Sequence, residues 1–185
     1  MNNESLKTIL DAHIGQIFAS PERINTMAAT VAQQISFQNR TVKPLLIGVM
    51  KGAAQWTAAV SQRLTIPSDL DFVSVASYEG SQQTTPVMRQ EPTLSVQNRH
   101  VILLDEIIDT GNTLHVLKHW ALDNGATSVQ TAIMVDKPMT RTISVDVDYL
   151  GITVPNVWVV GYGMDLNGAY RSLPVIAEYV DNPVG

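Results

Sequence analysis

Residues 101–114 form the stretch Val-Ile-Leu-Leu-Asp-Glu-Ile-Ile-Asp-Thr-Gly-Asn-Thr-Leu, in which four apolar residues run into acids, threonines and a glycine. The apolar run predicts a buried strand that ends at Asp105 and Glu106. A third acid, Asp109, precedes a short turn at 110–113 that opens a helix. Ligands of open parallel sheets bind beyond the carboxyl ends of the strands, so these acids are candidate site residues.

The turn at 110–113 is typical of a phosphate site. Unpaired backbone N–H groups at a helix N-terminus attract anions. Thr110 and Thr113 add hydroxyl donors, and Gly111 lets the backbone approach a ligand closely. The two adjacent acids suit sugar hydroxyls or a hydrated cation. The stretch therefore predicts a site for a phosphorylated sugar. The alternative, a capped helix with solvated acids, explains three acids and a glycine poorly.

Strands and helices alternate on both sides of this stretch. The expected strands are 45–50, 71–76, 101–104, 129–135 and 157–162, and the expected helices are 20–36, 53–64 and 113–124. This alternation predicts an α/β fold with a mainly parallel twisted sheet flanked by helices. The polar segment 78–98 has little periodicity and is expected to be functional or mobile. The first 17 residues favour no single state.

Composition narrows the class of protein. The 185 residues favour one domain. The absence of cysteine excludes disulfides, Cys-ligated metals and a catalytic thiol. A net charge of −5 argues against a sequence-blind nucleic-acid coat, and a charged content of only 16%, against the usual ~25%, hints at self-association. No signal-peptide core or membrane-length apolar run is visible, so a soluble cytoplasmic protein with no membrane partner is expected.

Five blocks of the chain together resemble one known family. Residues 101–114 resemble the phosphoribosyl-pyrophosphate motif of type I phosphoribosyltransferases. The other blocks resemble the hypoxanthine-guanine (6-oxopurine) branch, and they are Gly48–Gly52, Ser77-Tyr78, Asp136-Lys137-Pro138, and Asp148–Asp165 followed by Tyr170-Arg171. They occur in order between about residues 45 and 176. One departure is Asp105 before Glu106, because the branch usually has Glu before Asp, and this leaves the ribose and metal contacts of the two acids open.

The resemblance implies a fold, an activity and partners. The implied fold is the type I phosphoribosyltransferase fold as a single domain over 1–185, with a core at about 20–162, a small hood from the chain ends (about 1–17 and 163–185) and a mobile lid loop at about 77–98. The implied activity transfers the 5-phosphoribosyl group from phosphoribosyl pyrophosphate to hypoxanthine and/or guanine, giving IMP or GMP and pyrophosphate in purine salvage. Mg²⁺ is the implied cofactor. A homodimer or homotetramer is implied, with no nucleic-acid partner.

The resemblance also implies roles for individual residues. Asp109 is the expected general base toward the purine nitrogen. The expected phosphoribosyl and phosphate contacts are Lys51, Gly52, Asp105, Glu106, Thr110, Gly111, Asn112, Thr113 and Arg171. The expected purine contacts are Lys137, Trp158, Val159 and Asp165, the expected lid residues are Ser77 and Tyr78, and the expected metal-linked acids are Asp105, Glu106 and Asp165.

Some alternatives stay open at this point. The same fold also serves nucleotide-sensing regulators that bind nucleic acid, and a related enzyme would prefer xanthine. Trp158 is alternatively a core aromatic, and Lys51 a solvated lysine. The preference among hypoxanthine, guanine and xanthine, the oligomeric state, and the role of Arg89 and of the N-terminal segment do not follow from the sequence.

Overall fold

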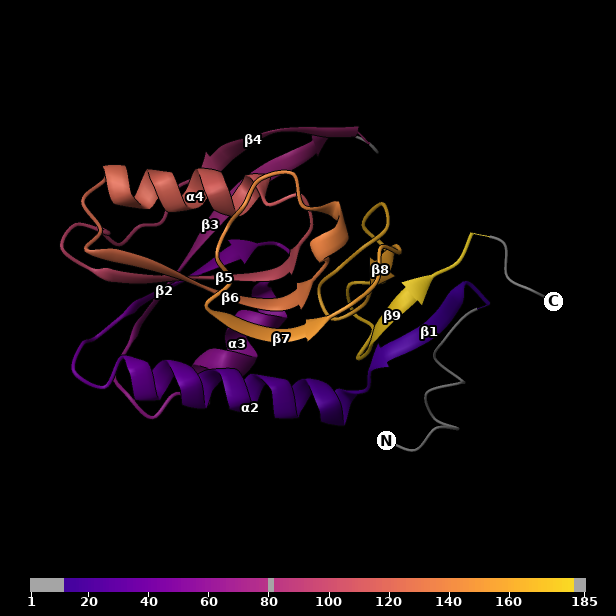
Figure 1. Cartoon of the computed structure of the whole chain (residues 1–185), viewed down its shortest axis with the longest axis horizontal. Coiled ribbons are helices and arrows are strands. Elements are labelled where there is room, and N and C mark those ends of the chain that lie inside the picture. Colours follow the sequence, from indigo (N-terminus) through magenta and orange to yellow (C-terminus); the bar gives the residue numbers. More distant parts are fainter. Residues whose placement is uncertain (1–11, 80–81, 182–185) are drawn as a thin grey trace.

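The computed structural model describes residues 12–79 and 82–181, and within them the chain forms two sheets and three α-helices (Figure 1). The larger sheet has six strands in the order β4-β3-β2-β5-β6-β7. Their bounds are β2 (Leu45–Met50), β3 (Asp69–Glu79), β4 (Gln82–Gln90), β5 (His100–Ile108), β6 (Ser128–Asp136) and β7 (Tyr149–Thr153). The helices are α2 (Pro21–Gln38), α3 (Ala54–Ser61) and α4 (Asn112–Asp123), with a 3₁₀ turn η1 (Pro138–Thr140).

Helices cover both faces of the larger sheet. The strand pairs β2–β3, β2–β5, β5–β6 and β6–β7 are parallel, so β2, β5 and β6 end at the same edge. Figure 1 shows α4 on one face and α2 and α3 on the other. The buried side chains of β5 alternate accordingly: Ile102 and Leu104 pack with α2 and α3, whereas Val101 and Leu103 pack with α4. The expected mainly parallel α/β sheet is confirmed.

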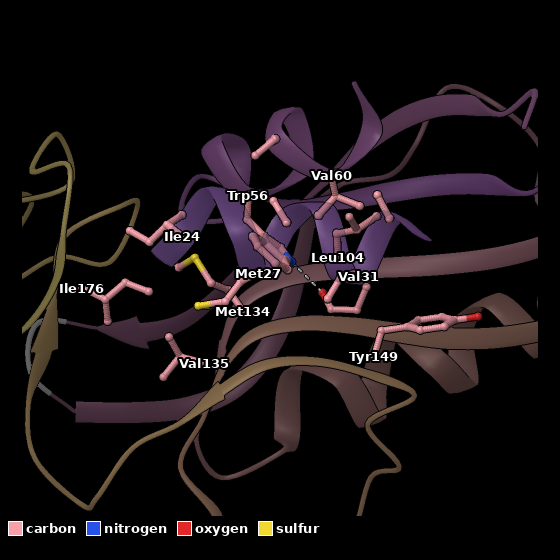
Figure 2. Close-up of a cluster of buried hydrophobic side chains, with 14 of the residues drawn as sticks. Ile24, Met27, Val31, Trp56, Val60, Leu104, Met134, Val135, Tyr149 and Ile176 are labelled. Atoms are coloured by element: carbon pink, nitrogen blue, oxygen red, sulfur yellow. Dashed lines mark hydrogen bonds between the residues drawn. The ribbon is translucent and has the colours of Figure 1, made fainter. Parts of the chain in front are cut away.

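The core under α2 and α3 is centred on Trp56 (Figure 2). This side chain is fully buried, and its indole Nε1 donates to the carbonyl oxygen of Ala132 in β6 at 3.0 Å. Ile24, Met27 and Val31 come from the buried stripe of α2. Burying a large aromatic is favourable only when its polar atom is paired, which this bond achieves.

The helix α2 begins as the sequence predicts. Ser20 is its N-cap and accepts from the Arg23 amide at 3.3 Å, and Pro21 occupies the first turn. The helix continues to Gln38, two residues beyond the expected end at 36. The helix α3 is shorter than predicted, since it ends at Ser61 instead of Leu64.

A smaller antiparallel sheet lies beside the larger one (Figure 1). It contains β1 (Ile14–Ala19), β9 (Ile176–Tyr179) and β8 (Val159–Val160), in the order β1-β9-β8. The prediction that 157–162 is a strand of the parallel sheet is therefore wrong. Gly161 has φ +93° and Tyr162 has φ +45°, so the extended backbone ends after Val160, and β8 pairs with β9. The strand that completes the parallel sheet is β7, which was not expected.

The segment 78–98 also differs from the prediction. Residues 82–90 form β4, which pairs antiparallel with β3 at the sheet edge. The polar sequence and Pro86 obscured it, and both are tolerated at an edge strand. The mobility of a lid at 77–98 stays a prediction, as does the division into a core and a hood formed by the chain ends. Residues 1–11 and 182–185 of that hood lie outside the described residues.

No helix in the described part of the chain is long and apolar enough to cross a membrane.

Candidate active site

A cavity of about 650 Å³ lies at the carboxyl ends of β2, β5 and β6. This volume is within the usual range for a small-molecule site. The predicted site residues that line it are Lys51, Gly52, Asp105, Glu106, Asp109, Thr110, Gly111, Asn112, Thr113, Lys137, Trp158, Val159, Asp165 and Arg171. The side chains of the predicted lid residues Ser77 and Tyr78 lie outside the described part of the structure. The carboxyl ends of three parallel strands and the segment between β8 and β9 thus bring together residues up to 120 positions apart (Lys51 to Arg171).

Asp105 and Glu106 form the floor of the cavity. Asp105 is 5% exposed, and its Oδ1 accepts from the Glu106 amide at 3.0 Å. Burial raises the pKa of Asp105 well above its ordinary value, and the neighbouring Glu106 charge raises it further. Burial also raises the pKa of Glu106, whereas the hydrogen bond with Asp105 and the Arg171 charge oppose that rise. Two buried acids of raised pKa are a common mark of a functional site.

Glu106 has an unpaired oxygen. Its Oε2 is buried and has no hydrogen-bond partner among the described residues. Its carboxylate lies directly against Gly52, since a Cβ at that position would be 1.8 Å from Oε1. A side chain at residue 52 would therefore compete with the acid for space. A buried carboxylate oxygen without a donor is costly unless a ligand or cation meets it.

These acids suit Mg²⁺ only together with a ligand. No three His, Asp or Glu side chains in the described ranges are grouped closely enough to hold a metal by themselves. Asp165 is already paired, because its Oδ1 lies 2.6 Å from Arg171 Nη2 and its Oδ2 accepts from the Gly168 amide at 2.7 Å. Mg²⁺ is commonly held by one or two carboxylates, waters and substrate phosphates. The orphaned Glu106 oxygen fits that mode of binding.

The N-terminus of α4 faces the cavity with its amides. Its N-cap, Gly111, makes no side-chain capping bond, so the first-turn N–H groups are left for a ligand. Gly111 has φ +90°, and a Cβ there would lie 2.5 Å from the Ile143 carbonyl oxygen. Only glycine fits this turn without displacing the neighbouring segment. The predicted turn and helix start thus lie at the cavity, and phosphate binding there stays a prediction.

The loop after β2 closes the opposite side. The peptide bond between Met50 and Lys51 is cis, and the Ala53 amide donates to Val49 O at 3.1 Å. Lys51 is exposed at this loop. Arg171, from the C-terminal segment, is held at the first turn of α3 directly after this loop, since its backbone carbonyl accepts from Gln55 Nε2 at 2.9 Å. Two cations therefore lie at the same side of the cavity.

Lys137 and Trp158 form the remaining wall. Lys137 is 7% exposed, and its Nζ lies 3.4 Å from Asp109 Oδ2. Trp158 is 49% exposed, lines the cavity and donates from Nε1 to Asp165 O at 3.3 Å. This exposure excludes the alternative that Trp158 is a core aromatic. Val159 is buried beside it.

Sequence reasoning missed two residues of this wall. Tyr179 and Asp181 also line the cavity. The Tyr179 amide donates to Trp158 O at 2.8 Å, which places the two residues opposite each other where β9 pairs with the segment that begins β8. Strands as short as these two carry no periodicity, and the run 176–179 does not alternate, so the sequence pattern did not indicate either strand.

Comparison with known proteins agrees with this geometry. The family model described as the phosphoribosyl transferase domain matches residues 13–167. The chain belongs to the phosphoribosyltransferase family. The family resemblance expected from the five sequence blocks is thereby confirmed.

Similar phosphoribosyltransferases come from several organisms. The hypoxanthine-guanine phosphoribosyltransferase of Streptococcus pneumoniae strain R6 is 33% identical over 170 residues, covering 91% of this chain and 94% of that protein. A crystal structure of a Bacillus anthracis hypoxanthine-guanine phosphoribosyltransferase is 28% identical with a TM-score of 0.84, covering 90% of this chain and 98% of that one. A Trypanosoma cruzi hypoxanthine phosphoribosyltransferase structure is 27% identical with a TM-score of 0.84, covering 90% and 92%.

Proposed function

We propose that this phosphoribosyltransferase transfers the 5-phosphoribosyl group from phosphoribosyl pyrophosphate to hypoxanthine and/or guanine, giving IMP or GMP and pyrophosphate in purine salvage. One observation carries the proposal. A single cavity combines open helix amides, two buried acids and a wall made of a lysine and an exposed tryptophan. Each part suits a different portion of the substrates: phosphate, ribose with its metal, and a flat base with an oxo group.

The phosphoribosyl half binds at the strand ends. The amides and hydroxyls of residues 110–113 take the 5-phosphate, where the α4 dipole favours negative charge. Asp105 and Glu106 face the ribose hydroxyls. Lys51, Gly52 and Arg171 receive the pyrophosphate at the opposite side. The acidic balance of the protein therefore does not oppose binding of a polyanion, because neutral amides and two local cations hold the phosphates.

Mg²⁺ is the proposed cofactor, and Asp105 and Glu106 would hold it together with substrate oxygens. Asp165 would be linked to this site through Arg171, with which it is paired. When bound, Mg²⁺ supplies neutralisation of the charge that develops on the pyrophosphate leaving group. The unpaired Glu106 Oε2 supports this assignment. Treatment with EDTA is expected to abolish turnover, and added Mg²⁺ to restore it.

The purine half binds against Trp158 and Lys137. Trp158 stacks on the base, Lys137 donates to the 6-oxo group and so disfavours adenine, and the backbone of Val159 meets the base edge. Asp109 accepts the purine ring proton as the nitrogen attacks the anomeric carbon. Its contact with Lys137 Nζ at 3.4 Å orients the carboxylate beside the base. The segment 77–98 closes over the oxocarbenium-like centre and excludes water.

The test is turnover with Mg²⁺ and phosphoribosyl pyrophosphate across hypoxanthine, guanine, xanthine and adenine. Hypoxanthine or guanine is expected to give nucleotide, and adenine none. The variant Asp109→Asn, which keeps the size of the side chain but removes the base, is the matched control for contaminating activity. The proposal is overturned if none of the 6-oxopurines gives turnover. If xanthine alone gives turnover, the base preference is reassigned.

We also infer a cytoplasmic homodimer or homotetramer. The low charged content of 16% supports self-association. Light scattering coupled to size-exclusion chromatography measures this directly, and a mass near 20.2 kDa contradicts it.

A further inference from the structure

The chain folds back on itself after β6 and lies along the phosphate turn. Residues 138–140 make one 3₁₀ turn, and the amides of Thr142 and Ile143 then both donate to Thr110 O at 3.0 Å. The segment that carries Lys137 is thus laid against the turn that carries Asp109. Two substrate-binding loops, one after β5 and one after β6, are therefore in contact.

The half-buried side chain of Arg141 joins the two loops. Arg141 Nε donates to the backbone oxygen of Asp109 at 3.0 Å, and its Nη2 pairs with Asp136 Oδ1 at the end of β6. The side chains of Arg141 and Asp136 are only 17% and 16% exposed. Arg141 itself is not among the described residues that line the cavity.

The chemistry of this bridge requires a guanidinium. Its two acceptors are a carbonyl oxygen on one loop and a carboxylate on the other, and a planar fork with several fixed donors serves both at once. An ammonium is a point charge, and in this position it satisfies the carboxylate or the carbonyl but not both. The Lys137–Asp109 contact, at 3.4 Å, is a longer link between the same loops.

We propose that Arg141 is a positioning residue that locks the purine loop (136–137) to the phosphate turn (109–113), so that the Asp109 carboxylate is aligned with the base held by Lys137. The proposal rests on the proposed phosphoribosyl transfer and adds to it a residue outside the substrate contacts. Asp136 is its anchor at the strand end. The loops are then set as one unit before substrates arrive.

This role predicts a specific kinetic signature. Arg141→Met, which keeps much of the apolar stem, should lower kcat by about 10- to 100-fold, since misalignment of about 1 Å costs about that much. The KM for phosphoribosyl pyrophosphate should stay within threefold, because the phosphate-binding amides belong to α4 itself. The KM for hypoxanthine should rise. Arg141→Lys should recover thermal stability through Asp136 but not kcat.

The matched control is Arg40→Met. Arg40 also donates to a backbone carbonyl, that of Phe37 at 3.0 Å, but it is exposed and far from the cavity. This variant should keep kcat within twofold. Hydrogen exchange of the Thr142 and Ile143 amides adds a readout independent of turnover, and it should accelerate at least tenfold in Arg141→Met only.

Three results would overturn the proposal. They are an unchanged kcat in Arg141→Met, full recovery of kcat in Arg141→Lys, and unchanged exchange at Thr142 and Ile143. If Arg141→Met does not fold, Arg141→Lys is the test. The proposal then requires that this variant recovers thermal stability but not kcat. A wild-type protein without turnover refutes the proposed function, whereas the exchange measurement still tests the bridge.

Discussion

Gly52→Ala is expected to disable the site through steric contact with Glu106. A Cβ on Gly52 would lie 1.8 Å from Glu106 Oε1 and 2.1 Å from its Cδ, while real Cβ atoms keep at least 3.0 Å. The carboxylate must therefore move by at least 1.2 Å, which is 3.0 Å minus 1.8 Å. The backbone at Gly52 has no positive φ, so alanine itself causes no conformational strain there.

The size of the effect follows from this displacement. A misplacement of about 1 Å at a reacting centre costs about 10²-fold in rate, so kcat/KM for phosphoribosyl pyrophosphate should fall about 100-fold, or about 2.7 kcal/mol. Extra volume in a packed interior costs about 1–3 kcal/mol of stability. For a chain of this size, each kcal/mol lowers Tm by about 2–4 °C.

Steady-state kinetics and thermal unfolding measure both quantities. Gly125→Ala is the control for stability alone, because Gly125 has φ +87° and lies after α4, away from the cavity. Left-handed alanine costs about 1–2 kcal/mol, so this variant should lose Tm and keep kcat/KM. A second control introduces Gly52→Ala into the Glu106→Ala variant. The clashing atoms are absent from that variant, so Gly52→Ala should cause no further loss of stability there.

The steric argument fails under either of two results. One is a kcat/KM of Gly52→Ala within threefold of the wild type. The other is an equal loss of Tm in the Glu106 and Glu106→Ala backgrounds, which would show that the methyl group meets something other than the carboxylate.

Three further predictions concern other parts of the molecule. Asp109→Ala should lower kcat by about 10²–10⁴-fold and weaken phosphoribosyl pyrophosphate binding less; equal losses in kinetics and calorimetry would make Asp109 structural. Trp56→Phe removes the bond to Ala132 O and should lower unfolding free energy by about 1–3 kcal/mol while preserving turnover; a denaturant midpoint equal to the wild type refutes this. Burial raises the pKa of Asp105 and Glu106 above their ordinary 3.8 and 4.5, so the folded state binds more protons than the unfolded state. The contribution of these two acids to stability should then be full below those ordinary values and be lost as pH rises through the raised ones. Glu106→Gln should flatten a Tm-against-pH profile, and an unchanged slope contradicts this.

Much of the sheet followed from the sequence because its strands are buried on both faces. The run at 45–50 is continuously apolar, and the run at 129–135 is apolar from residue 132 onward, which is typical of central parallel strands. The missed strands lie where this signal is absent. β4 is a polar edge strand, and β7 contains Gly151 and has mixed burial. Their pairing depends on neighbours that single-segment patterns do not contain.

The candidate site was more predictable than the small sheet. Its acids, glycine and helix start all lie within 101–114, so the residue types of this one stretch already indicate a ligand site. Tyr179 and Arg141 were missed for a different reason. Tyr179 meets the cavity only because β9 pairs with β8, and Arg141 acquires its partners only because the chain returns to Thr110 after β6.

The buried acids also explain why substrate and folding should be linked. In the free protein Asp105 and Glu106 are adjacent and have little contact with solvent, and the Oε2 atom of Glu106 lacks a hydrogen-bond donor among the described residues. Ionising both acids there is unfavourable, so the empty site resists the charge state that ribose and a cation require. A ligand that brings a divalent cation and hydroxyl donors removes that penalty. Phosphoribosyl pyrophosphate with Mg²⁺ should therefore raise Tm more at pH 8 than at pH 5. This difference should be smaller in Glu106→Gln, whereas titration of the phosphates themselves, with a pKa of about 6, would contribute equally in both proteins.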